Sequence, residues 1–289
     1  MKGFLKNILW PTDFSHEAQE ALLYAEVFAK AFEARITALH VSPDLSLALY
    51  DEASAGIQQE LIREMEGSKT RAQAKIQAVA RKRGFSFKQI IVTEGSASKK
   101  IVETAEKEKA DLIVMGKRGQ SLVDKILIGS VANHVLRHSP VPVLVTKKRK
   151  QKFDVKKILV PTDFTKGEDV ERDFAWKLAK NFKASLTFLY VLELFGYESR
   201  LVDHMFKAVL DKFQKKIKGE GKRIAYSAEV TKAINAATGI DKYGRKFGYD
   251  LIVMATCASS LGRFFLGSTT EKVLSSTDLP VFVLPPKYC

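Results

Sequence analysis

Three glycines and one serine have the spacing of a loop that could bind phosphate. Residues 112–115 form a short apolar run of the kind found in a strand that is buried on both faces of a parallel sheet. Gly116 ends this run, and Gly119 follows it. Nine residues separate Gly119 from Gly129 and Ser130, after which a short apolar helical pattern begins. The predicted order is therefore strand, glycine loop, helix.

Each part of this loop suits an anion for a physical reason. A Cβ atom would obstruct a positive φ angle in the turn or hold phosphates away from the main chain, so the first two glycines suit both the turn and a close approach. Ser130 or Gly129 can cap the helix, whose first N–H groups lack intrahelical partners and whose dipole is positive at that end. Lys117 and Arg118 would add positive charge. The alternative is an ordinary strand-to-helix connection in which the glycines only form turns.

The same four residues fit the pattern G-x2-G-x9-G-[ST], the nucleotide-binding signature of the universal stress protein family, and their flanking residues also resemble that family. The loop differs from a P-loop, because GxxxxGK[ST] does not occur in the chain. The resemblance implies an adenine nucleotide, ATP or AMP. It implies a regulatory protein of the stress response that holds this nucleotide at the carboxyl ends of a five-stranded parallel sheet. Mg2+ is a further candidate, because it could polarise the phosphates of such a nucleotide.

The resemblance also implies which residues meet the nucleotide. Asp13 would contact the ribose or the base, main-chain groups near Val41 would meet the adenine, and the glycine loop with Ser130 and Val131 would hold the phosphates. Asp13 has an alternative role as a cap of the helix that follows it. The candidate nucleotide-binding residues are Pro11, Thr12, Asp13, Val41, Met115, Gly116, Arg118, Gly119, Gly129, Ser130 and Val131.

The chain contains one unit twice. The segment ILWPTDFS at residues 8–15 returns as ILVPTDFT at residues 158–165, DLIVMG returns as DLIVMA, and GSVANHVLRHSPVPVLV returns as GSTTEKVLSSTDLPVFV. Repeats of this length are duplicated domains, since each is long enough for a core of its own. We expect one domain at residues 1–146, a basic linker at 147–157 and a second domain at 158–289, an arrangement that resembles the tandem type of the family.

Strand and helix patterns alternate in the first copy. We expect strands at residues 8–10, 35–41, 87–93, 111–115 and 141–146, and helices at 17–32, 51–83 and 98–109. Ser15 is expected to cap the first helix. The second helix is expected to carry one apolar face, formed by Ile57, Leu61, Ile62, Met65, Ile76, Val79 and Ala80. This alternation predicts an α/β fold with a parallel sheet, helices on both faces and ligands at the carboxyl strand ends. The family resemblance implies two tandem five-stranded parallel sheets, Rossmann-like and similar to the adenine nucleotide alpha hydrolase-like group.

The second copy departs from the signature. Ala255 and Ala258 stand where the first copy has its first two glycines, and the loop that follows is one residue shorter. An alanine is strained at a positive φ and its methyl group occupies phosphate space, so we expect weak or absent nucleotide binding in this half. Gly239 and Gly244 are expected to weaken its third helix. The second half is therefore predicted to be mainly a structural partner.

The net charge of +14 lies mostly in the second half. Residues 147–157 hold seven basic residues against one acid, which is typical of a solvated tether, with a nucleic-acid contact as the less favoured alternative. No apolar run approaches the roughly 20 residues that cross a bilayer. The chain has two cysteines, Cys257 and Cys289, so a reducing compartment such as the cytoplasm is expected.

The same residues also allow other functions and partners. Lys117, Arg118 and Mg2+ could support slow ATP hydrolysis or phosphotransfer, but no evident base orients a water, so a binding protein is favoured over an enzyme. His134 and His138 have the spacing of a metal pair but lack a third ligand. The family resemblance implies that the two halves pack as a pseudo-dimer through residues 143–145 and 281–284, and that two such chains could pair again as a homodimer.

Overall fold

The computed structural model describes residues 4–44, 55–119, 128–147, 153–163, 168–193, 208, 210–211, 224–256 and 266–285. The first half contains β1 (Asn7–Pro11), α1 (His16–Phe32), β2 (Arg35–Ser42), α2 (Ala55–Arg83), β3 (Gln89–Glu94), α3 (Ala97–Lys107), β4 (Leu112–Gly116), α4 (Ser130–His138) and β5 (Val143–Thr146). The second half contains β6 (Lys157–Pro161), α5 (Glu168–Phe182), β7 (Ser185–Glu193), β8 (Tyr226–Ala233), α7 (Ala236–Lys246), β9 (Leu251–Ala255), α8 (Ser268–Ser276) and β10 (Val281–Leu284).

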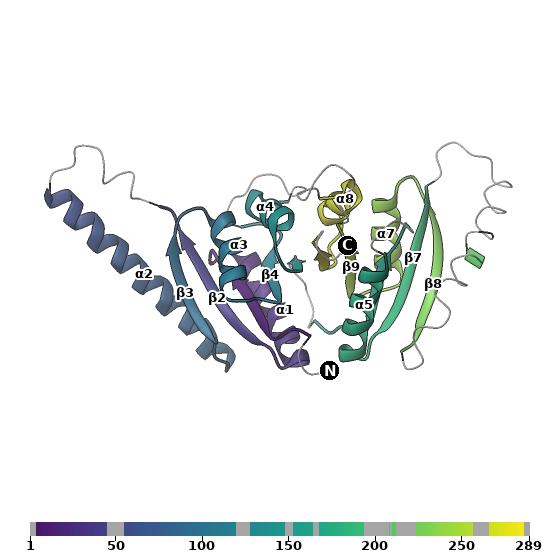
Figure 1. The fold of residues 1–289 in the computed structure, drawn as a ribbon, viewed down its shortest axis with the longest axis horizontal. Helices are drawn as coiled ribbons and strands as arrows, with labels where there is room; N and C mark the ends of the chain where they lie inside the picture. Colours follow the sequence, from purple (N-terminus) through teal and green to yellow (C-terminus); the bar gives the residue numbers. More distant parts are fainter. Residues whose placement is uncertain are drawn as a thin grey trace.

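The strands form one sheet in the order β3-β2-β1-β4-β5-β10-β9-β6-β7-β8. Within each half every recorded strand pair is parallel, as the alternation of strands and helices predicts. The halves meet where β5 and β10 pair antiparallel, with Val145 opposite Val281 and Val143 opposite Val283. The predicted fold class and the predicted meeting of the two fifth strands are both confirmed (Figure 1).

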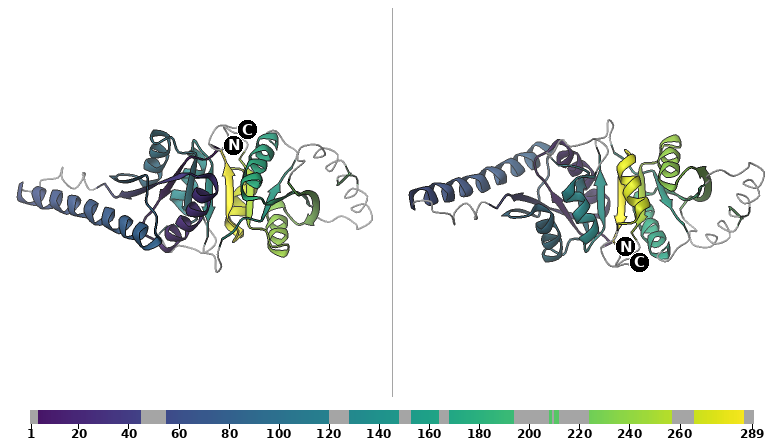
Figure 2. Two further views of the ribbon diagram at one scale, coloured as in Figure 1. Left: turned by 90° about the horizontal axis from the view of Figure 1, so that it is seen from below. Right: turned by 90° about the horizontal axis from the view of Figure 1, so that it is seen from above.

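Helices cover both faces of this sheet. One apolar cluster joins the sheet to α1, α2 and α5, and a second cluster joins it to α3, α4, α7 and α8. Figures 1 and 2 show the arrangement of these helices around the sheet. The first helix begins one residue earlier than predicted, at His16, and the predicted cap is confirmed, because Ser15 Oγ accepts a hydrogen bond from Ala18 N at 3.1 Å. Strand β3 begins two residues later than predicted, and Phe87 instead stacks on Trp10 with ring centroids 5.6 Å apart.

Helix α2 departs from the prediction of one buried face along its whole length. Ile76 and Ala72 are buried, but Ile62 is 47% exposed. The helix has 29 residues and therefore spans about 44 Å, whereas its six-residue neighbour β3 spans about 20 Å. The amino-terminal part of α2 consequently projects beyond the sheet (Figure 1). The side chains of Ile57 and Leu61 lie outside the described residues.

Aromatic side chains join the two halves on the face that carries α1 and α5. The ring of Phe28 lies 5.0 Å from that of Phe182 and 5.8 Å from that of Phe282 between centroids. Within the second half, the ring centroids of Phe174 and Phe282 are 4.9 Å apart. The halves therefore share part of one hydrophobic core rather than meeting through β5 and β10 alone.

The basic segment between the halves is not simply a solvated tether. Phe153 and Val155 are buried, and the Phe153 ring lies 4.3 Å from that of Tyr24 between centroids. The expectation of a solvated linker is therefore wrong for these residues, because two apolar side chains within the charge run reach the shared core. Residues 148–152 lie outside the described part of the chain.

Candidate functional site

A cavity of about 450 Å³ opens at the carboxyl ends of β1, β2 and β4. Strand β1 lies between β2 and β4, so the chain's winding reverses at this point, where ligands bind in open parallel sheets. The structure brings all the candidate nucleotide-binding residues together in the lining of this cavity: Pro11, Thr12, Asp13, Val41, Met115, Gly116, Arg118, Gly119, Gly129, Ser130 and Val131. Segments more than 100 residues apart in the sequence thus form one site.

Six further residues line the cavity and were not named from the sequence: Ala18, Leu39, Ala97, Ile101, Ile128 and Ala132. A signal for some of them was available. Leu39 is two positions before Val41 in the same strand, so both side chains face the same side of the sheet. Ala97 begins α3 shortly after β3 and Ile101 lies about one turn later, so both are near the carboxyl edge of the sheet.

The cavity has two chemically different ends. Leu39, Val41, Ile101 and Met115 give apolar walls beside β2, α3 and β4. The other end is formed by the glycine loop with Arg118 and by the first turn of α4, which starts at Ser130. Free N–H groups and the positive end of the helix dipole make such a turn favourable for an anion. The arrangement suits a ligand with a flat apolar part and an anionic part.

The glycines are needed for close approach, and the expectation of positive φ angles is wrong. The positive-φ glycines of the described chain are Gly84, Gly95 and Gly248, none of which belongs to the loop. A Cβ atom at Gly116 would lie 2.8 Å from the Cβ and 3.0 Å from the carbonyl carbon of Glu17 in α1. A Cβ atom at Gly119 would overlap Asp13 Oδ2. Gly116 therefore permits α1 to pack on β4, and Gly119 leaves room for the Asp13 carboxylate.

The turn from Pro11 to Ser15 fixes the Asp13 carboxylate in place. Asp13 Oδ1 accepts a hydrogen bond from Ser15 N at 3.0 Å, while Ser15 itself caps α1. His40 Nδ1 lies 2.8 Å from the carbonyl oxygen of Thr12, and Thr12 Oγ1 accepts a hydrogen bond from Phe14 N at 3.1 Å. Asp13 thus stabilises the turn with one oxygen and directs the other towards Gly119.

The two ends of the glycine loop are tied to one another. Gly129 is the N-cap of α4, and its N–H donates to the carbonyl oxygen of Lys117 at 3.0 Å. Residues 120–127 lie outside the described part of the chain. The hydrogen bond places the first turn of α4 directly beside the end of β4, which lets Gly116 and Ser130 line the same cavity.

The universal stress protein family model matches the chain twice, over residues 5–147 and 154–285. The chain belongs to the universal stress protein family. Universal stress protein MJ0531 of Methanocaldococcus jannaschii is 40% identical to it over 153 residues, which are 52% of this chain and 86% of that protein. Universal stress protein MJ0577 of the same organism is 34% identical over 161 residues, or 52% and 99% of the two chains. Each relative corresponds to about half of this tandem universal stress protein.

Solved structures of universal stress proteins share the fold along nearly the whole chain. A universal stress protein from Archaeoglobus fulgidus has a TM-score of 0.71 and 25% identity, and the match covers 97% of this chain and 98% of that one. A putative universal stress protein from Pseudomonas aeruginosa has a TM-score of 0.64 at 19% identity, over 98% and 95% of the two chains.

Across the segments that the structure describes, no helix has the length and hydropathy needed to cross a membrane.

Lys117 does not add its charge to the end of the cavity that favours an anion, contrary to the expectation. Its side chain is 1% exposed, and Nζ donates to the carbonyl oxygen of Ser275 in α8 at 2.8 Å. Burial, together with the nearby Lys147 and Arg118, lowers the pKa of Lys117 to about 7. Arg118 remains as the basic side chain that lines the cavity.

His134 and His138 contact one another within α4. The His134 and His138 rings stack with centroids 4.0 Å apart, and His138 Nδ1 lies 2.8 Å from the carbonyl oxygen of His134. Burial and the neighbouring His138 lower the pKa of His134. Over the described residues, no group of three or more His, Cys, Asp or Glu side chains could hold a metal ion. Cys257 and Cys289 lie outside the described part of the chain.

In the second half, helix α7 packs tightly over the position that corresponds to the apolar end of the cavity. A Cβ atom at Gly239 would lie 2.6 Å from Val191 Cγ1, and Val191 is the counterpart of Val41. A Cβ atom at Gly244 would lie 2.8 Å from Leu279 Cδ1. These glycines do not prevent the helix, which runs from Ala236 to Lys246. They allow it to approach the sheet closely, which the sequence alone did not reveal.

Proposed function

We propose that this universal stress protein binds one adenine nucleotide, ATP or AMP, in the cavity of its first half and acts as a regulatory protein of the stress response. The observation that carries the proposal is the convergence of Asp13, Val41 and the whole glycine signature on one cavity at the switch point of the sheet. The volume of about 450 Å³ lies within the range of roughly 300–1,000 Å³ that is usual for small-molecule sites. We place this function in the cytoplasm.

The two ends of the cavity match the two ends of such a nucleotide. The adenine would lie between the apolar walls formed by Leu39, Val41 and Ile101. The phosphates would lie against the first turn of α4 and Arg118, where main-chain N–H groups, the helix dipole and a guanidinium all favour negative charge. Mg2+ would be held chiefly by the phosphate oxygens, as it is in many nucleotide sites. Asp13 Oδ2 is an acceptor for a ribose hydroxyl or for the adenine amino group.

Binding without efficient catalysis is the function that the lining favours. Asp13 is the one carboxylate that lines the described cavity, and its Oδ1 already accepts the Ser15 N–H. A carboxylate engaged in this way stabilises a turn and is poorly placed to activate a water. In the second half, the close packing of Gly239 against Val191 supports our expectation of weak or absent binding there. We therefore expect one nucleotide for each chain.

Isothermal titration calorimetry with ATP and AMP tests this proposal on the full chain. We expect saturable binding with a stoichiometry of one in the wild type, and loss of binding in Gly119→Val, whose side chain would occupy the space beside Asp13. Gly67→Val in the projecting part of α2 is the matched control, because its Cβ would meet only the flexible end of Arg71 at 3.1 Å. Absence of binding in the wild type would refute the proposal. Labelled ATP returned uncut would distinguish a binding protein from a slow hydrolase.

The domain limits and the assembly complete the proposal. We propose domains at residues 1–146 and 158–289 joined by residues 147–157, and the family matches at 5–147 and 154–285 support these limits to within a few residues. Because Phe153 and Val155 pack into the shared core, the linker would also hold the halves together. Pairing of two such chains as a homodimer stays a prediction, which light scattering at several protein concentrations would test.

A further inference from the structure

Lys117 lies between the cavity of the first half and helix α8 of the second half. It stands between Gly116 and Arg118, which both line the cavity. Its N–H donates to the carbonyl oxygen of Thr146 at 2.9 Å, and its carbonyl oxygen accepts from Gly129 N at 3.0 Å. The main chain of Lys117 therefore links β4, the end of β5 and the cap of α4. A shift of this residue would move the glycine loop and the first turn of α4, which form the anion-binding end of the cavity.

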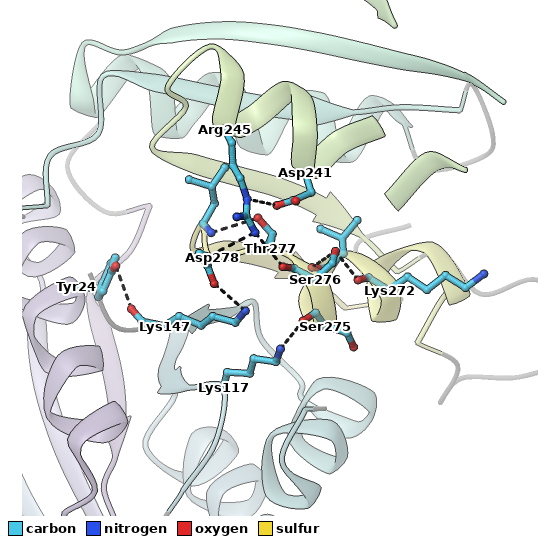
Figure 3. A network of polar contacts seen from close by, with 12 residues as sticks. Tyr24, Lys117, Lys147, Asp241, Arg245, Lys272, Ser275, Ser276, Thr277 and Asp278 are labelled. Atoms are coloured by element: carbon cyan, nitrogen blue, oxygen red, sulfur yellow. Dashed lines mark hydrogen bonds and ion pairs between the residues drawn. The ribbon is translucent and has the colours of Figure 1, made fainter. Parts of the chain in front are cut away.

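The side chain of Lys117 leaves the cavity and enters the second half. Its Nζ donates to the carbonyl oxygen of Ser275, in the last turn of α8, at 2.8 Å (Figure 3). The last carbonyl groups of a helix lack intrahelical donors and lie at the negative end of the dipole, so they favour an ammonium group. Arg245 Nη2 donates to the next carbonyl, that of Ser276, at 3.2 Å. Two basic side chains thus cap α8, Lys117 from the first half and Arg245 from the second.

The charges around Lys117 come from several elements. Lys147, which follows β5, and Arg118, in the glycine loop, oppose a positive charge on Nζ, whereas Asp278, which follows α8, favours it. Lys147 Nζ forms an ion pair with Asp278 at 3.2 Å, and Arg245 approaches the same carboxylate at 3.4 Å. Because burial and the neighbouring cations lower the pKa of Lys117 to about 7, a small added potential changes its protonation near neutral pH.

The contact is asymmetric between the two halves. Thr256 occupies the position in the second half that corresponds to Lys117. Its N–H and its hydroxyl both donate to the carbonyl oxygen of Leu284, at 2.9 Å and 3.0 Å, and so it stays within its own half. The Lys117 side chain therefore extends from the half with the intact glycine signature to the half in which that signature is altered.

We propose that Lys117 is a positioning residue that anchors the glycine loop of the first half to helix α8 of the second half, so that the second half strengthens nucleotide binding in the first. The part of this inference that concerns affinity rests on the proposed function, whereas the anchoring does not. Bound phosphates beside Arg118 and Gly119 would also attract a proton to Lys117. Nucleotide binding and the contact with α8 would then favour one another, as linkage requires.

Calorimetric titration of the full chain with ATP at pH 8, in two buffers of different ionisation enthalpy, tests the coupling. The wild type should take up protons on binding, and Lys117→Met should bind about tenfold more weakly without that uptake, which corresponds to a modest coupling between sites. Lys82→Met, at an exposed position of α2, should behave as the wild type does. Equal affinity in Lys117→Met and the wild type, or no proton uptake in the wild type, would overturn the coupling.

Hydrogen exchange without nucleotide separates the anchor from the proposed function. In Lys117→Met, peptides that cover Gly129 and α8 should exchange at least several-fold faster than in the wild type, because the loop and the end of α8 lose their connection. Unchanged exchange in both peptides would refute the anchor. If the wild type binds no ATP, the proposed function fails, and this exchange measurement alone decides whether Lys117 fastens the two halves.

Discussion

Replacement of Gly119 by alanine is expected to act on the ligand through Asp13. The added methyl group would overlap Asp13 Oδ2 and would lie 3.5 Å from Asp13 Cγ. The obstacle is the end of a side chain, so the carboxylate can turn away while the backbone stays in place. Gly119 does not have a left-handed φ, and alanine is therefore free of backbone strain at this position.

The expected magnitudes differ for folding and for binding. Turning the carboxylate away breaks the 3.0 Å hydrogen bond from Ser15 N to Asp13 Oδ1, which costs about 1.5–3 kcal/mol because the acceptor is charged. A glycine-to-alanine change recovers about 0.4–1 kcal/mol by restricting the unfolded chain. The free energy of unfolding should consequently fall by about 0.5–2.5 kcal/mol. A lost charge-assisted hydrogen bond to the nucleotide is worth about 1.5–3 kcal/mol, so the Kd for ATP should rise by roughly 10- to 100-fold.

A double-mutant cycle checks that the effect passes through Asp13. Titration calorimetry would give the Kd for ATP of the wild type, Gly119→Ala, Asp13→Ala and the double variant, with urea unfolding to confirm stability. We expect the double variant to bind no more weakly than Asp13→Ala, because the methyl group then has no carboxylate to displace. Gly67→Ala controls for an added methyl group outside the cavity lining. If the effects of the two substitutions multiply in the double variant, the reasoning is refuted.

Three further predictions concern stability. Gly116→Ala should lower the free energy of unfolding by about 1–3 kcal/mol in urea titrations, since its Cβ would meet the backbone of Glu17 at 3.0 Å, and an unchanged midpoint would contradict the close packing of α1 on β4. Lys117 has a pKa lowered from 10.5 to about 7, so between these pH values the unfolded chain binds more protons than the folded chain. The free energy of unfolding should therefore rise with pH across this window, by up to about 5 kcal/mol more in the wild type than in Lys117→Met. Parallel pH profiles of the two proteins would argue against the lowered pKa. Ile76→Ala should cost about 2–4 kcal/mol, whereas Ile62→Ala should cost less than about 0.5 kcal/mol, and similar losses at both positions would contradict the exposure of the projecting part of α2.

Local sequence patterns predicted most of the fold. Apolar runs with glycine or proline at their ends predicted strands close to those observed, and Ser15 marked the start of α1. The repeated segments indicated two units, and the glycine spacing indicated a site at the carboxyl ends of the strands. Every candidate residue lines the cavity at the switch point, because strand order and parallel direction bring the ends of β1, β2 and β4 together.

Sequence patterns failed where an outcome depended on a neighbour from elsewhere in the chain. A glycine looks the same whether it needs a positive φ or a close contact, and only the packing of Glu17 and Asp13 shows that the second reason applies to Gly116 and Gly119. The charge run at the linker predicted solvation, yet Phe153 packs on Tyr24. A helical apolar stripe predicts a buried face only as far as the sheet extends beneath it, and α2 is longer than its neighbour β3.

The sequence by itself determined the elements, their order, the duplication and the residue types at the carboxyl edge, because periodicity, turn chemistry and glycine spacing are local properties of the chain. Only the tertiary structure decided where Lys117 points, since a basic residue beside an anion loop can face the cavity or leave it. Its direction depends on the end of α8, where the carbonyl oxygen of Ser275 lies 158 positions later in the chain and 2.8 Å from Lys117 Nζ in a fold that pairs β5 with β10.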